Sequence, residues 1–167
     1  AGGTFKPKYQ GQRDGDLPFI KVKDLSRQGN ATVITGADNW VTFEECAEFR
    51  GRPFSEGTSV FAKIGEGLRQ NRLRFLARDT LIDNNMMGAI PDERVTVGEY
   101  LYFLLQDYDL ASYAGGAAVP FLSAKVLEVI GVLAPAIQVL ALFRDAVAPV
   151  FRQIVTLERQ SAAAAAA

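Results

Sequence analysis

The stretch that decides the fold runs from Val119 to Gln160 and reads VPFLSAKVLEVIGVLAPAIQVLALFRDAVAPVFRQIVTLERQ. Its second part repeats apolar residues at spacings of three and four, which is typical of a helix with one narrow apolar stripe. We expect one helix from Ile137 to about Gln160, kinked at Pro149 because proline removes a helical hydrogen bond. Two helices meeting at Pro149 are the alternative. The residues expected to pair with another helix are Leu140, Phe143, Val147, Val150, Ile154 and Leu157.

Short elements precede this helix. Ser123 is expected to cap a helix that Gly131 ends, and the apolar residues before Pro135 predict a short strand. Thr42 and Glu45 have the spacing of a capping box, which predicts a helix ending near Phe49. A further helix is expected over 97–105, and β-favouring runs lie at 17–22, 31–35, 59–64, 74–77, 80–82 and 86–90. The sequence therefore predicts an α+β fold: a compact body of short strands and helices followed by a long C-terminal helix.

Composition excludes several kinds of chemistry. The chain has 167 residues, one cysteine and no histidine, so catalytic triads, Cys-His pairs and most zinc sites are not expected. We expect no catalytic residue, no metal and no cofactor of its own. No apolar run is long enough for a membrane span and no signal peptide is recognised, so a cytoplasmic protein is expected.

The charges are unevenly distributed. Residues 1–78 hold 13 Lys/Arg and 9 Asp/Glu, whereas residues 79–167 hold 5 and 10, which together give the net charge of −1. An excess of cations in one half permits a nucleic-acid-binding face there. An ordinary mixed surface is the alternative interpretation.

Residues 63–74, KIGEGLRQNRLR, combine cations for phosphates with amides suited to base edges. The opening loop is a second candidate, and the asparagine turn at 84–85 a third. The alternative for 63–74 is a solvated hairpin, and the alternative for the opening loop is a mobile terminus. The asparagines at 84–85 could instead form a turn that bonds its own backbone. The expected DNA-binding residues are Lys6, Lys8, Tyr9, Lys63, Arg69, Gln70, Asn71, Arg72, Arg74, Asn84 and Asn85.

Several short motifs follow one another in a characteristic order. They are Gly3-Thr4, the run LPFIKVKDL over 17–25, Lys63-Ile64-Gly65, Asp83-Asn84-Asn85, the run YLYFLL over 100–105, and Leu122-Ser123 to Ile130 with Pro135. In this order the chain resembles one half of the specificity (S) subunit of type I restriction-modification systems. It departs from the commoner P-x-x-E-Q ending, because no Glu stands beside Gln138.

The resemblance implies a non-catalytic subunit with a target recognition domain over 1–135 and a spacer helix over 136–161 that forms a coiled coil. The six alanines at 162–167 are expected to be an appended tag or residues of unassigned identity. The partners implied are double-stranded DNA, methyltransferase (M) and restriction (R) subunits, and a second recognition half or a second copy. S-adenosylmethionine, ATP and Mg would then belong to the partner subunits.

Two alternatives stay open from the sequence. One is a coiled-coil interaction protein without DNA affinity, which the small net charge allows. The other is the recognition domain of a single-chain restriction-methyltransferase. A methyltransferase motif of the Asn/Asp-Pro-Pro-aromatic type is not found in the sequence.

Overall fold

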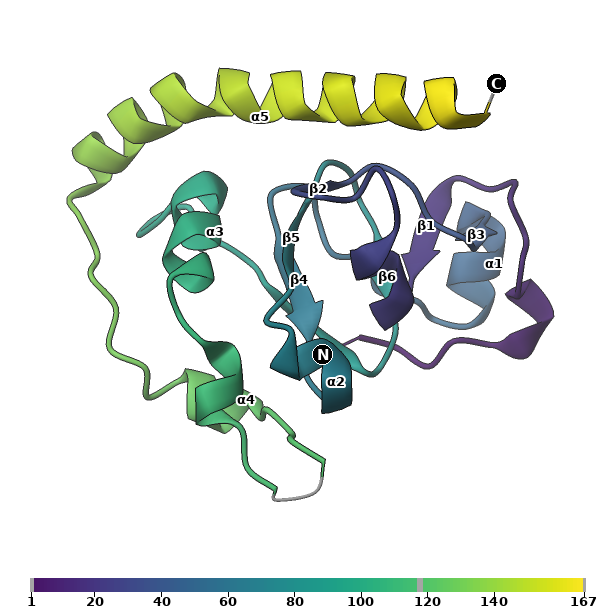
Figure 1. The fold of residues 1–167 in the computed structure, drawn as a ribbon, viewed down its shortest axis with the longest axis horizontal. Coiled ribbons are helices and arrows are strands. Elements are labelled where there is room, and N and C mark those ends of the chain that lie inside the picture. The colour runs from purple at the N-terminus through teal and green to yellow at the C-terminus, as the bar shows by residue number, and fades with distance from the viewer. Residues whose placement is uncertain (1, 117–118, 167) are drawn as a thin grey trace.

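A computed structural model describes residues 2–116 and 119–166 and has two small sheets with helices on their outer sides (Figure 1). The first sheet has the order β3-β1-β6. Its strands are β1 (Leu17–Ile20), β3 (Trp40–Val41) and β6 (Leu81–Ile82). The second sheet has the order β2-β5-β4-β7. Its strands are β2 (Val33–Ile34), β4 (Ser59–Ala62), β5 (Leu73–Leu76) and β7 (Met86–Ala89).

Neighbouring residues of each strand point into different cores, because successive side chains of a strand alternate between the two faces of a sheet. In β4, Phe61 lies in the core between the second sheet and the helices, whereas Val60 and Ala62 lie in the core between the two sheets. In β1, Ile20 faces the core between the sheets and Phe19 faces a third core beside α1. Both faces of each sheet are therefore covered, which explains why the strands read as continuous apolar runs.

The helices confirm part of the prediction. The capping box is present at α1 (Phe43–Glu48), where the Glu45 backbone N–H donates to Thr42 Oγ1 at 3.2 Å. The expected helix near 97–105 is α3 (Gly98–Gln106). Three 3-10 helices, η1 (Pro7–Tyr9), η2 (Val22–Ser26) and η3 (Leu110–Tyr113), were not anticipated.

Three local expectations were wrong. Residues 65–69, for which no helix was expected, form the short helix α2 (Gly65–Arg69). The helix after Ser123 is only α4 (Ala124–Leu127), and it ends well before Ile130. The apolar residues before Pro135 form no strand, and Leu133 is 75% exposed. This connector is held by side chains instead, since the Tyr100 hydroxyl donates to the Leu133 carbonyl at 2.9 Å.

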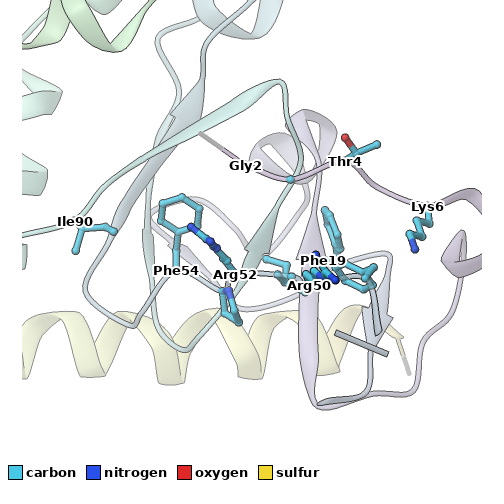
Figure 2. Close-up of a pocket in the computed structure, with 13 residues that line it drawn as sticks. Gly2, Thr4, Lys6, Phe19, Arg50, Arg52, Phe54 and Ile90 are labelled. Carbon is cyan, nitrogen blue, oxygen red and sulfur yellow. The ribbon is translucent and has the colours of Figure 1, made fainter. Parts of the chain in front are cut away.

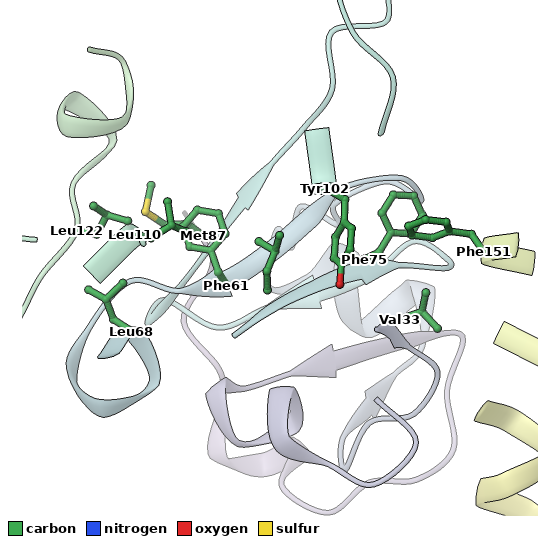
Figure 3. Close-up of a cluster of buried hydrophobic side chains, with 10 residues drawn as sticks. Val33, Phe61, Leu68, Phe75, Met87, Tyr102, Leu110, Leu122 and Phe151 are labelled. Atoms are coloured by element: carbon green, nitrogen blue, oxygen red, sulfur yellow. The ribbon is translucent and has the colours of Figure 1, made fainter. Parts of the chain in front are cut away.

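The long C-terminal helix is confirmed. Helix α5 (Ile137–Ala166) runs without interruption through Pro149 and continues into the alanine tract. In Figure 1, α5 lies along one side of the body, over α3 and the second sheet, and does not project away from it. Phe151 is 5% exposed in the core that α3 covers, and its ring centroid lies 4.8 Å from that of Phe75 (Figure 3).

This packing changes the interpretation of the predicted stripe. Leu140 is 1% exposed, and Val147 and Ile154 pack against the core that contains Phe151. Phe143 contacts the rings of α3. These positions cover the chain's own body and do not form a ridge facing a partner. Val150 and Leu157 are 54% and 52% exposed, so only these two members of the stripe face outward.

Candidate nucleic-acid interface

The predicted interface at 63–74 is divided by the fold. Arg69 and Gln70 are exposed at the end of α2. Both interact with Glu66 on the same helix: the Arg69 guanidinium lies 3.7 Å from one of its carboxylate oxygens, and Gln70 Nε2 donates to the other at 3.2 Å. These two side chains remain accessible to a ligand, with a carboxylate beside them.

Asn71 and Arg74 instead hold the body together. Asn71 has a φ of 46° and joins α2 to the η3 region: its Nδ2 donates to the Tyr108 carbonyl at 2.8 Å, and its Oδ1 accepts from the Leu110 N–H at 3.1 Å. Arg74 is half-buried and donates to the backbone carbonyl of Asn30, and burial lowers its pKa. The expectation that these two residues read DNA does not fit the structure. Arg72 is also half-buried.

The opening loop packs on α1. Tyr9 is 2% exposed and belongs to the core beside α1, so its expected contact with DNA does not fit. Lys8 forms an ion pair with Glu48 at 2.8 Å, and this hydrogen bond raises the pKa of Lys8. Lys6 remains exposed, with its Nζ 5.7 Å from the centre of the Phe49 ring.

Segments distant in sequence meet where β4 ends. The Lys63 N–H donates to the Asn85 carbonyl at 2.9 Å, and the Lys63 carbonyl accepts from the Leu122 N–H at 2.8 Å. The Gly3 N–H donates to the Ile82 carbonyl at 2.9 Å, directly before the asparagine turn. Four of the motifs that follow one another along the sequence therefore lie side by side. We call the exposed or half-buried side chains at this end, Lys63, Asn84, Asn85 and Phe121, the β4-end surface.

Asp83 organises the turn of this surface. Its carboxylate accepts from the Asn85 N–H at 2.9 Å, and burial raises its pKa. Because Asp83 closes the turn, Asn84 and Asn85 stay exposed at its tip. Lys63 Nζ lies 5.7 Å from the centre of the Phe121 ring, and Phe121 is 45% exposed. The surface thus presents a cation, two amides and an aromatic ring to solvent.

A pocket of about 570 Å³ lies beside the opening segment (Figure 2). Arg50 and Arg52 occupy its middle in this view, between Phe54 and Phe19, and Lys6 lies at one end. No carboxylate lines it among the described residues. Arg50 and Arg52 were missed from the sequence, although two arginines beside Gly51, directly after a predicted helix, were a visible signal. The described lining residues are Gly2, Gly3, Thr4, Lys6, Phe19, Phe49, Arg50, Gly51, Arg52, Pro53, Phe54, Leu81 and Ile90.

The backbone around this pocket is tightly constrained. Gly2 passes so close to the first sheet that a Cβ there would lie 2.0 Å from the Asp83 carbonyl oxygen. Arg50 follows α1 with a φ of 55°, in the left-handed region that favours glycine. The Gly51 N–H donates to the Cys46 carbonyl at 2.8 Å, which closes the end of the helix. An arginine at this position therefore carries backbone strain.

The described residues contain no cluster of three or more His, Cys, Asp or Glu side chains that could hold a metal ion. None of the helices in this part of the chain is long and apolar enough to cross a membrane. Comparison of the sequence with protein-family models and with curated proteins gives no match.

Proposed function

We propose that this chain is a DNA-recognition subunit of the type I restriction-modification kind, which reads one half of a bipartite target and positions methyltransferase and restriction subunits. The meeting of Gly3-Thr4, Lys63-Ile64-Gly65, Asp83-Asn84-Asn85 and Leu122 at one end of the sheets carries this proposal. Motifs that are separate in sequence but joined in space are typical of a single functional surface. The chain itself is proposed to be non-catalytic.

The chemistry of the β4-end surface suits duplex DNA. A lysine binds phosphate as a point charge, and an asparagine amide can donate and accept at once, as an adenine edge requires. Phe121 offers an apolar face to a sugar or a thymine methyl group. In Figure 1, α2, α4 and the N-terminus lie on the side of the body opposite α5. A duplex at this end would leave the outer face of α5 free for a partner subunit.

The outer face of α5 is a second proposed interaction surface. Val139, Leu142, Val150 and Leu157 are between 52% and 71% exposed, and 100° per residue places them on one side of the helix. We define these four residues as the outer stripe. Apolar helix faces of this kind are usually covered by a partner helix. We propose that helix pairing occurs through the outer stripe, which keeps Val150 and Leu157 of the six residues predicted from the sequence. The outer stripe also supports the alternative of an interaction protein without DNA affinity.

A salt titration separates these two functions. Binding of the purified chain to a pool of random 30-base-pair duplexes should weaken steeply with salt, because phosphate contacts release counterions. Lys63→Ala should reduce the slope of log affinity against log salt by about 1. Asn84→Ala should leave the slope unchanged and lower the preference for a selected target over the pool.

Arg144→Ala, an exposed arginine on α5, is the matched control and should bind like the wild type. All variants should keep the wild-type melting temperature. If no duplex binds at low salt, or if Lys63→Ala and Arg144→Ala have the same slope, the β4-end surface is not the DNA interface.

A further inference from the structure

We infer that the pocket lined by Lys6, Arg50 and Arg52 binds a nucleotide, with the phosphate on the cations and the base against the phenylalanine walls. Gly3 and Thr4 belong both to the pocket lining and to the motifs that meet near the β4-end surface, but the side chains that carry this inference are Lys6, Arg50 and Arg52, which are not part of that surface. The inference therefore does not depend on the proposed function. The nucleotide could come from a free nucleoside monophosphate or from one residue extruded from a nucleic acid. The chemistry that the pocket would recognise is the same in both cases.

The charge of the lining calls for an anion. Two other exposed cations of the first half of the chain, Lys8 and Arg27, form ion pairs with Glu48 and Asp38. Lys6, Arg50 and Arg52 form no ion pair within residues 2–116 and 119–166, and no carboxylate from these residues lines the pocket. The pocket places two guanidinium groups and one ammonium group on the same concave surface, where they repel one another. A bound anion would offset this repulsion. Arginine is well suited to phosphate because its planar donors bind it in a bidentate manner.

The aromatic side chains of the pocket walls suit a ligand that has a flat apolar group next to its anionic group. Three phenylalanines line the pocket together with the two arginines, namely Phe19, which is 1% exposed, Phe49 and Phe54. Ile90, 60% exposed, closes the far end (Figure 2). Bases stack on aromatic side chains without regard to sequence. The volume of about 570 Å³ lies within the range of pockets that enclose small organic ligands.

Arg50 supplies an independent argument. It occupies a left-handed backbone position where glycine would be unstrained, at the end of α1. The other non-glycine residue with positive φ in the described chain, Asn71, is held there by hydrogen bonds of its side chain. The Arg50 backbone is held by the hydrogen bonds that end α1, whereas its side chain forms no hydrogen bond in the described structure. A strained residue that points its guanidinium into a cavity indicates a site.

Titration of the chain with AMP, adenosine and inorganic phosphate, followed by calorimetry, tests the inference. AMP should bind at least about tenfold more tightly than either adenosine or phosphate, since only AMP uses both parts of the pocket. A hairpin duplex with one unpaired 2-aminopurine tests the second source. If AMP does not bind but this probe changes its fluorescence on binding, the nucleotide is one extruded from DNA.

Arg50→Gly gives the sharpest variant. It should weaken binding of the responding probe about tenfold or more while leaving the melting temperature equal or higher, because glycine relieves the left-handed backbone. Arg52→Ala should weaken binding at unchanged melting temperature, and Arg144→Ala should change neither. The inference is overturned if neither probe binds, if phosphate alone binds as tightly as AMP, or if Arg50→Gly binds like the wild type.

Discussion

Replacing Phe151 by alanine should lower the free energy of unfolding by about 3–5 kcal/mol, the usual cost of truncating a buried phenylalanine. Phe151 is 5% exposed, and its ring lies 4.8, 5.6 and 5.9 Å from the rings of Phe75, Tyr102 and Phe103. Each aromatic pair stabilises the fold by about 0.5–1.5 kcal/mol in addition to the contribution of the buried apolar area. For a domain of this size the loss corresponds to a decrease in melting temperature of about 6–20 °C.

Urea unfolding followed by the fluorescence of Trp40, the single tryptophan, measures this loss. Trp40 lies in β3, in the first sheet, so its signal reports unfolding of the body and not of α5 alone. The matched control is Leu142→Ala, because Leu142 is on the same helix but is 71% exposed, and it should cost less than about 0.5 kcal/mol. If Phe151→Ala is as stable as this control, α5 does not pack on the body, and the interpretation of α5 as part of the core is wrong.

Three further predictions concern a polar bridge, the outer stripe and a titrating group. Asn71→Ala should destabilise the fold by about 1–3 kcal/mol in the same urea assay, since it leaves two backbone groups without partners; a change below 0.5 kcal/mol would show that water replaces them. Leu142→Asp together with Leu157→Asp should abolish self-association, as measured by light scattering, while the variant stays folded; a wild type that is monomeric, or a variant of unchanged mass, would contradict pairing of two copies through the outer stripe. Burial raises the pKa of Glu158, whose carboxylate accepts from the Thr32 N–H at 3.0 Å. The Glu158 carboxyl group therefore binds its own proton more tightly in the folded state than in the unfolded state. The wild type should therefore lose stability relative to Glu158→Gln as the pH rises from the ordinary glutamate pKa through the raised one; a constant difference between pH 4 and pH 7 would count against this.

Local patterns in the sequence predicted the elements well where the signal is itself local. The capping box at Thr42 and the long C-terminal helix depend on residues a few positions apart, and both are present. Helix α2 was missed because its two glycines resemble a turn. Gly67 is needed there for tertiary packing, since a Cβ would lie 2.5 Å from Val22.

The side of α5 that faces the body could not be read from spacing alone. Leu140 and Leu142 lie on different sides of the helix and are both apolar, so the spacing of apolar residues allows either side to face the body. The side that faces the body is determined by contacts with the aromatic rings of α3, and the position of these rings depends on the whole fold. For the same reason the sequence missed the pocket at Arg50, because the pocket walls come from five separate segments. It also assigned Asn71 and Arg74 to DNA, although their partners lie in other elements.

The alternation of the strands has a consequence for which substitutions this protein can accept. On the helix side of the second sheet stand Phe61, Phe75 and Met87, whereas Val60 and Ala62 face the other sheet. Sliding β4 by one residue would keep its apolar side chains out of water, yet it would place the Phe61 ring in the space that Val60 and Ala62 occupy. The register of β4 is therefore determined by the volumes of its side chains and not by their polarity. An exchange of one apolar residue for another of different size should be tolerated less well here than in a sheet with one wet face.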